Sequence, residues 1–85
     1  MPQITFKLYA TLGDHLPADK RQGNAMPLTV APDAAITDII APFAMPPKLV
    51  HLVLVNGVFI PPEARATRTL QEGDVLAIWP PVAGG

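Results

Sequence analysis

The sequence predicts an α+β fold in which one helix packs on one face of a mixed sheet of four to five strands. Strand-like segments stand at both ends of the chain, at 3–9 and 75–79. Between them, one segment has apolar residues at helical spacing. The chain has 85 residues, without an internal repeat, which favours one domain. The ubiquitin-like β-grasp is the architecture that this order of elements best fits.

The first strand is expected at residues 3–9, QITFKLY, where Ile4, Phe6 and Leu8 alternate with more polar residues. A long connection over 10–24 follows because glycine and charged residues are frequent there, with a helical turn expected at its start. A second short strand is expected at 26–32, because its prolines stand at its ends, where no ladder amide is needed.

The helix is expected at roughly 35–43, with Asp33 as its N-cap. Its apolar residues recur at helical spacing: Ile36, Ile39, Ile40 and Phe43. Pro42 removes a backbone donor and clashes with the preceding turn, so the helix should end or kink there. Because residues 42–47 are rich in proline, the helix is expected to be short or broken.

The segment 48–57, KLVHLVLVNG, is apolar nearly throughout, which predicts a central strand covered on both faces. Asn56-Gly57 predicts a hairpin into a short edge strand at 58–60. A loop follows, with a turn of helix expected around 69–72. The last strand, 75–79, leads directly into the C-terminal segment, so we expect a domain at 1–79 and a flexible, extended tail at 80–85.

Composition excludes several classes of function. The net charge is −1 and basic residues are scattered, which argues against nucleic-acid binding and against a polybasic membrane patch. The chain has neither cysteine nor serine, so thiolate sites and a Ser-His-Asp triad are excluded. His15 and His51 lack further ligands at metal-site spacing, and no metal or cofactor site is expected. With neither a signal peptide nor an apolar run near ~20 residues, a soluble cytoplasmic protein is expected.

The tail, WPPVAGG, carries the strongest functional signal. Pro80 and Pro81 fix φ and favour an extended path, and Trp79 is restricted because it precedes a proline. Gly84 and Gly85 lack a Cβ, so they can pass a slot too narrow for other residues. A glycine carboxylate is ionised at neutral pH and is a poor electrophile until another enzyme activates it.

The whole chain resembles the MoaD/ThiS family of ubiquitin-like sulfur carriers, and most closely the small subunit of molybdopterin synthase. Three segments carry the resemblance: ITFKLYATLGDHL, VLVNGVFI and LQEGDVLAIWPPVAGG. The last matches the family pattern L-x-x-G-D, an apolar strand, an aromatic residue and P-P-V-x-G-G. The matching residues are Leu70, Gly73, Asp74, Trp79, Pro80, Pro81, Val82, Gly84 and Gly85.

The resemblance implies that the protein is no enzyme on its own and binds no cofactor. A MoeB-like, ubiquitin-activating-like adenylyltransferase would use ATP to adenylylate Gly85, and a sulfur donor would convert the adenylate into a thiocarboxylate. The tail, with Gly84, would then enter the large, MoaE-like subunit of molybdopterin synthase, in a heterotetramer, and donate sulfur to the pterin precursor. Many relatives carry an Arg-Glu pair where this chain has Leu12-Gly13-Asp14, so that loop is not assigned a partner.

A partner-binding surface is expected at the base of the tail, formed by Trp79, Pro80, Pro81 and Val82 with Phe59 and Ile60. The alternative for Phe59 and Ile60 is that they pack in the core. Other functions remain open at this point. The sulfur could serve thiamin, cysteine or another thio-metabolite. Gly85 could instead be ligated to lysines, as in a ubiquitin-like modifier, or the chain could be a binding module with an inert tail.

Overall fold

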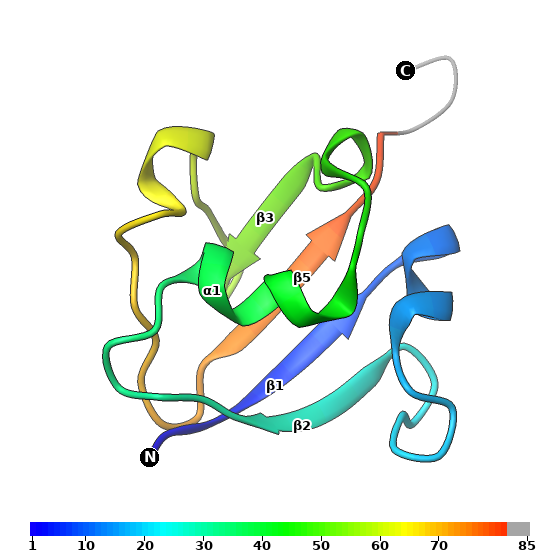
Figure 1. The fold of residues 1–85 in the computed structure, drawn as a ribbon, viewed down its shortest axis with the longest axis horizontal. Coiled ribbons are helices and arrows are strands. Elements are labelled where there is room, and N and C mark those ends of the chain that lie inside the picture. The colour runs from blue at the N-terminus through cyan, green and yellow to red at the C-terminus, as the bar shows by residue number, and fades with distance from the viewer. Residues whose placement is uncertain (82–85) are drawn as a thin grey trace.

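A five-stranded mixed sheet carries the fold, and the structure, a computed structural model, describes residues 1–81 (Figure 1). The strand order is β2-β1-β5-β3-β4, with β1 and β5 parallel and every other neighbouring pair antiparallel. The strands are β1 (Gln3–Leu8), β2 (Ala25–Thr29), β3 (Leu52–Val55), β4 (Val58–Phe59) and β5 (Val75–Trp79). The predicted α+β class with one helix on a mixed sheet is therefore confirmed.

The core lies between the sheet and α1 (Ile36–Ile40). The predicted alternation in β1 is confirmed, because Ile4, Phe6 and Leu8 are buried while the residues between them are not. The β1–β5 register places Phe6 beside Leu76. The Phe6 ring also lies 4.7 Å from that of Phe43, beyond α1. The central strands thus bury one face against the helix and the segment that follows it.

The helix is shorter than the predicted 35–43. Its α-helical part ends at Ile40 and continues as a 3₁₀ turn, Ala41–Phe43, because Pro42 cannot donate the next bond. The prediction that Asp33 caps the helix is wrong. Ala35 is the N-cap, and its amide donates to Oδ2 of Asp38 at 3.0 Å. None of the helices within residues 1–81 has the length and apolar character to cross a membrane.

Two other local expectations need correction. β3 is not covered on both faces, because only Val53 and Val55 are buried while Leu52 and Leu54 are half-buried. The helical turn expected at 69–72 is absent from the described chain. Instead, a 3₁₀ turn forms at Pro62–Ala64, where proline occupies the first turn and needs no partner for its missing amide.

The first long connection begins with a 3₁₀ helix at Ala10–His15, as predicted. The strand expected at 48–57 begins only at Leu52, because Pro47–Leu49 forms a 3₁₀ turn. The strand expected at 26–32 is β2, and Pro27 lies inside it rather than at its end. β4 is an edge strand, as expected.

The hairpin at Asn56-Gly57 forms as predicted, with positive φ at both residues, 52° and 82°. The Asn56 side chain also joins the hairpin to the start of β5. Its Nδ2 donates to Oδ1 of Asp74 at 2.9 Å, and its Oδ1 accepts from the Val75 amide at 2.9 Å. The Gln71 amide donates to Oδ2 of Asp74 at 2.8 Å. The carboxylate of Asp74 therefore connects two turns that are distant in sequence.

Asp74 is expected to make stability depend on acidic pH. Hydrogen bonds from the Gln71 amide and the Asn56 side chain lower the pKa of Asp74 below its ordinary value of 3.8, against a smaller opposing effect of burial. The carboxylate therefore stabilises the fold above its unfolded pKa, and this contribution is lost as the pH falls through the lower folded value. Asp74→Asn should cost roughly 1 kcal/mol at neutral pH.

Urea unfolding from about pH 6 to about pH 3 tests this expectation. The stability difference between wild type and Asp74→Asn should shrink as the pH falls. Asp14→Asn is the matched control, because Asp14 is exposed and its carboxylate accepts none of the hydrogen bonds described for residues 1–81. A constant difference over this pH range would contradict the assignment.

Candidate functional site

The candidate site is the base of the C-terminal tail, at the end of β5. Two backbone hydrogen bonds hold this end from both sides. The Tyr9 amide donates to the Ile78 carbonyl at 3.1 Å, and the His51 amide donates to the Trp79 carbonyl at 3.2 Å. The chain then continues through Pro80, which is buried, and Pro81, which is exposed. The tail therefore begins from a strand that is fixed by both of its neighbours.

Tyr9 and Trp79 form an aromatic stack at this base. Their ring centroids are 3.7 Å apart and their planes differ by 6°. The two residues meet because β1 and β5 are parallel, so that both strands end at the same rim of the sheet. Trp79 remains 36% exposed. The stack restricts an aromatic side chain that is still accessible to a partner.

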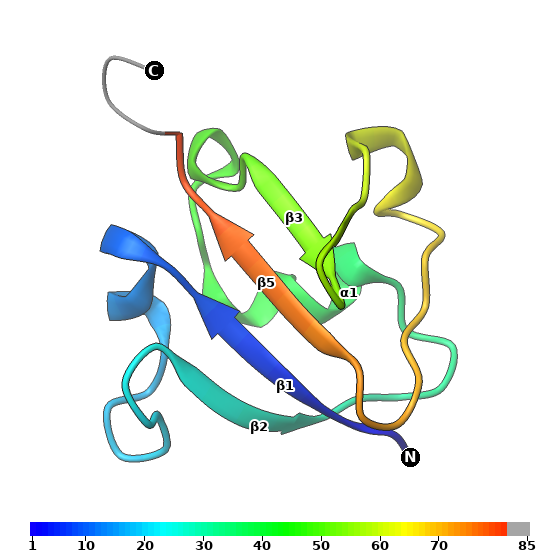
Figure 2. The same cartoon turned by 180° about the vertical axis from the view of Figure 1, so that it is seen from behind.

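An apolar surface extends from this stack across the side of the sheet that α1 does not cover. Side chains alternate along β3 and β5. Val53 and Ile78 face the core, whereas their neighbours in each strand face the opposite side of the sheet. The register pairs Leu52 with Trp79 and aligns Leu54 with both Ala77 and Phe59. Figure 2 shows β1, β5 and β3 in front of α1 on this side. We call this surface the helix-free face: Tyr9, Leu52, Leu54, Phe59 and Trp79, around the buried Ala77.

The structure separates the residues that the sequence assigned to a partner surface. Trp79 and Phe59 are on the helix-free face, and Phe59 is 48% exposed. Ile60 is 4% exposed, and its amide donates to the Val53 carbonyl at 2.8 Å. The placement of Ile60 on the surface is therefore wrong, because its side chain completes the core beside β3. Val82, Gly84 and Gly85 lie outside the described residues.

Arg65 is a residue of the site that the sequence did not indicate. Its side chain is 7% exposed and donates to three backbone carbonyls: Nε to Ile60 at 3.0 Å, Nη2 to His51 at 3.1 Å and Nη1 to Val50 at 3.3 Å. Burial lowers the pKa of the Arg65 guanidinium, while the charge of Glu63 raises it. Two of the bonds hold Val50 and His51 just before β3, and the amide of His51 binds the base of the tail.

The other residues singled out in the sequence have local structural roles. Nδ1 of His15 is 3.2 Å from the Phe43 carbonyl, and the His51 side chain is exposed. Leu70 is buried in the core, and Gly73 has a φ of 86°, which favours glycine. Leu70, Gly73 and Asp74 together build the turn at the start of β5. The L-x-x-G-D part of the motif thus lies at the opposite end of β5 from Trp79.

Comparisons with known proteins agree with this architecture. A family model described as Mut7-C ubiquitin matches residues 1–84. Two solved structures from Haloferax volcanii are similar. The crystal structure of SAMP1 has a TM-score of 0.66 at 23% identity, over 98% of this chain and 99% of that one. The solution structure of the HVO 2177 protein has a TM-score of 0.72 at 21% identity, over 99% and 87%. None of the curated proteins matches the sequence.

These identities support the likeness of fold, whereas the family match covers nearly the whole sequence. The predicted ubiquitin-like character is confirmed, and the protein belongs to the Mut7-C ubiquitin family.

Proposed function

We propose that the protein is a sulfur carrier in molybdenum cofactor biosynthesis. An ATP-dependent activating enzyme adenylylates the carboxylate of Gly85, and a sulfur donor converts the adenylate into a thiocarboxylate. The protein then donates this sulfur within the large subunit of molybdopterin synthase. The observation that carries the proposal is that the fixed strand β5 ends at the helix-free face, with the sequence P-P-V-A-G-G following it along the chain.

The arrangement separates binding from delivery. The helix-free face offers apolar and aromatic area, with Trp79 at the point where the tail begins, and such area is enriched in protein interfaces. The sequence beyond Pro81 contains no side chain larger than valine. A partner bound to the helix-free face would therefore receive a narrow segment with its reactive end some residues away. Pro80 and Pro81 limit the conformational freedom of that segment and so reduce the entropy lost on binding.

The chemistry requires little from the carrier itself. The activating enzyme binds ATP and transfers AMP to the Gly85 carboxylate, releasing pyrophosphate. A donor at the oxidation level of hydrosulfide then displaces AMP, leaving a thiocarboxylate. Gly84 and Gly85 contribute small size, and Trp79, Pro81 and Phe59 contribute contacts. The same activated carboxylate would also suit ligation to lysine, and the ubiquitin-like fold favours this modifier role as the second candidate.

The intact mass of the protein tests the proposal. After incubation with an activating enzyme, ATP and a sulfur source, the mass should rise by the difference between sulfur and oxygen. The measurement also verifies that Gly85 ends the chain. Deletion of Gly85 should abolish the shift, whereas Lys20→Ala, in the exposed connection after β1, should leave it unchanged. An unchanged mass with an enzyme that modifies its own carrier would contradict the carrier role.

Two further outcomes separate the candidates. Production of molybdopterin from its precursor, with the large synthase subunit added, would support the molybdenum pathway over a thiamin or cysteine pathway. Adducts of the protein on lysines of other proteins, lost with the Gly85 deletion, would favour the modifier role instead.

A further inference from the structure

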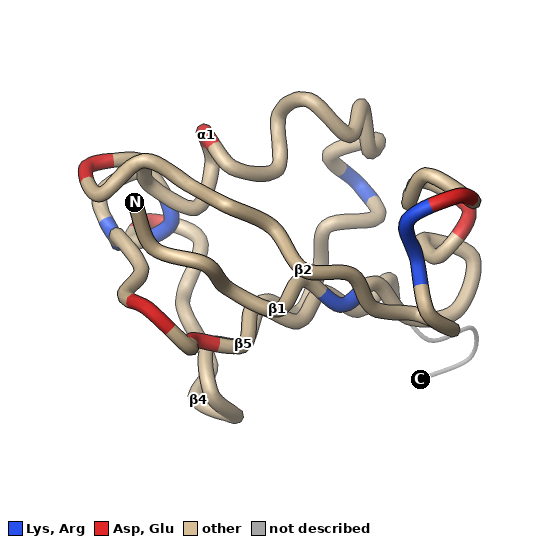
Figure 3. Tube along the Cα trace, turned by 90° about the horizontal axis from the view of Figure 1, so that it is seen from below, with Lys and Arg blue, Asp and Glu red and all other residues tan. Residues whose placement is uncertain are grey.

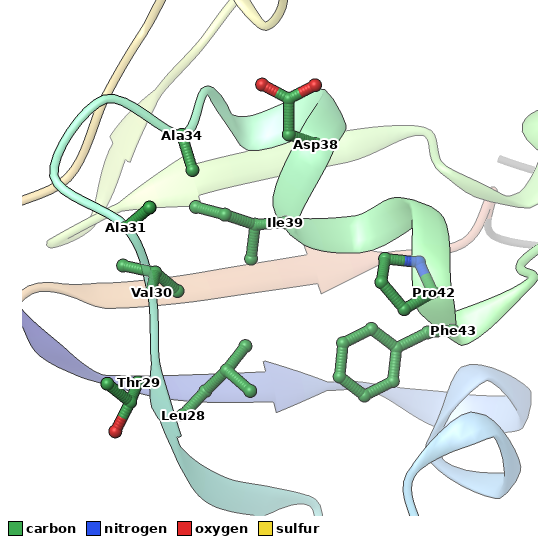
Figure 4. A pocket seen from close by; sticks show the side chains of 9 residues that line it. All are labelled: Leu28, Thr29, Val30, Ala31, Ala34, Asp38, Ile39, Pro42 and Phe43. Atoms are coloured by element: carbon green, nitrogen blue, oxygen red, sulfur yellow. The ribbon is translucent and has the colours of Figure 1, made fainter. Parts of the chain in front are cut away.

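A second apolar surface lies between α1 and the edge strand β2, on the helix side of the sheet. It is a groove of about 250 Å³. The residues that form its apolar wall are Leu28, Val30, Ala34, Ile39, Pro42 and Phe43. Figure 4 shows the side chains of Val30, Ile39 and Phe43 directed toward one another across the groove. The groove shares no residue with the helix-free face, so the proposed sulfur transfer does not use it.

The strand beside the groove has open backbone groups. β2 is at one end of the strand order and, within residues 1–81, pairs only with β1. The Val30 amide donates to the Pro2 carbonyl, and the Leu8 amide donates to the Asn24 carbonyl. Because antiparallel pairs alternate, these bonds direct the backbone groups of Pro27 and Thr29 away from β1.

Only a short part of this outer edge is open. The backbone groups of Ala25 are taken by Gln22, at 2.7 and 3.2 Å, and Pro27 has no amide. The carbonyl of Pro27 and both backbone groups of Thr29 remain, next to the groove. An edge of this kind accepts an added strand over a few residues and disfavours a longer one.

The charge at the groove is acidic. Asp38 is the one charged residue among those that line it, and Figure 4 shows its carboxylate on the outer side of α1, directed away from the apolar side chains. One of its oxygens accepts the Ala35 amide, and the other accepts no hydrogen bond from the described part of the chain and can contact a cation. Asp33 is exposed in the loop between Ala31 and Ala34. Figure 3 shows the acidic position on α1, while the Lys and Arg positions are scattered over the fold.

We propose that this groove binds an extended segment of a partner protein, with apolar side chains at alternate positions and Lys or Arg at an end. The segment pairs in β conformation with the edge at Thr29, places its apolar side chains against Ile39 and Phe43, and places its cation by Asp38. The acidic rim favours a basic partner over a second copy of this chain, because a second copy would bring the same acidic residues, Asp33 and Asp38, to the interface.

Peptide titration of the ¹⁵N-labelled protein tests this proposal. The probe is a heptapeptide in which valine alternates with threonine between terminal lysines, and its matched partner has terminal glutamates. Saturable shifts are expected at Thr29, Ala34, Asp38 and Ile39. The glutamate peptide should bind about three- to tenfold more weakly. Shifts confined to the helix-free face, absence of saturable shifts, or shifts that appear with protein concentration alone would overturn the proposal.

Variants and modified probes test the two parts separately. Asp33→Asn with Asp38→Asn keeps acceptors for the local backbone and should abolish the preference for lysine. Ala34→Leu should fill the groove and weaken binding, whereas Ala18→Leu, on an exposed loop, should not. N-methylation of the valine amides in one probe and of the threonine amides in another should abolish binding of only one, because alternate residues present their amides to one edge. Equal binding of both would exclude strand addition. Thiocarboxylate formation should be unaffected by these variants, so the two proposals fail independently.

Discussion

Trp79→Ala is expected to weaken binding of the activating enzyme about 30-fold or more, which corresponds to the loss of a large aromatic hot spot at the centre of an interface. Trp79 is 36% exposed, and it stands where the tail begins. Its stack on Tyr9, with centroids 3.7 Å apart, reduces the freedom that it would lose on binding. Tyr9→Ala should weaken binding less, because it frees the indole without removing it.

The measurement is the dissociation constant for the activating enzyme, with a thermal melt of each variant to verify that it folds. Val58→Ala is the matched control. Val58 is 64% exposed, but it pairs with the core residue Val55 and so lies on the opposite side of the sheet edge from Phe59. The affinity of the Val58→Ala variant for the activating enzyme should match that of wild type. Unchanged affinity in a folded Trp79→Ala variant would remove the helix-free face from the proposed mechanism, as would an equal loss in Val58→Ala.

Local sequence predicts a strand well when one of its faces is buried and the other is exposed, because apolar and polar residues then alternate. β1 is of this kind, because Ile4, Phe6 and Leu8 alternate with residues that reach solvent. The hairpin at Asn56-Gly57 is equally local, since its positive φ values suit these two residues. The C-terminal end of α1 also follows from one residue, Pro42. Its N-terminal cap does not, because the Ala35 amide bonds Asp38 and not the predicted Asp33.

The residues that were misplaced depend on contacts distant in sequence. Leu52 and Leu54 are as apolar as Val53 and Val55, so the pattern of β3 does not distinguish a core face from an uncovered one. Phe59 and Ile60 are adjacent, and only the pairing of β4 with β3 places one outside and the other inside. Arg65 gives no periodic signal at all, since its burial depends on carbonyls at 50, 51 and 60.

Arg65→Met is expected to lower the free energy of unfolding by about 3 kcal/mol, because it leaves three carbonyls without their donor. The guanidinium of Arg65 donates its hydrogen bonds to the backbone carbonyls of Ile60, His51 and Val50, and none of these acceptors is a carboxylate. Methionine fills much of the same volume, so the loss measures the hydrogen bonds rather than a cavity. Arg65→Lys should recover only part of it, because an ammonium group lacks the planar fork that reaches separate carbonyls. Urea unfolding monitored by Trp79 fluorescence gives the free energies.

Arg68→Met is the control, since Arg68 is exposed and its Nε bonds only to the neighbouring Thr69 carbonyl. It should change stability by less than about 0.5 kcal/mol. The two variants also separate stability from positioning. Loss of the Arg65 bonds frees the residues before β3, so the His51 amide, which binds the Trp79 carbonyl at 3.2 Å, should exchange with solvent faster than the Tyr9 amide on the other side of β5. Equal acceleration at both amides would mean that Arg65 stabilises the whole domain and has no particular part in fixing the base of the tail.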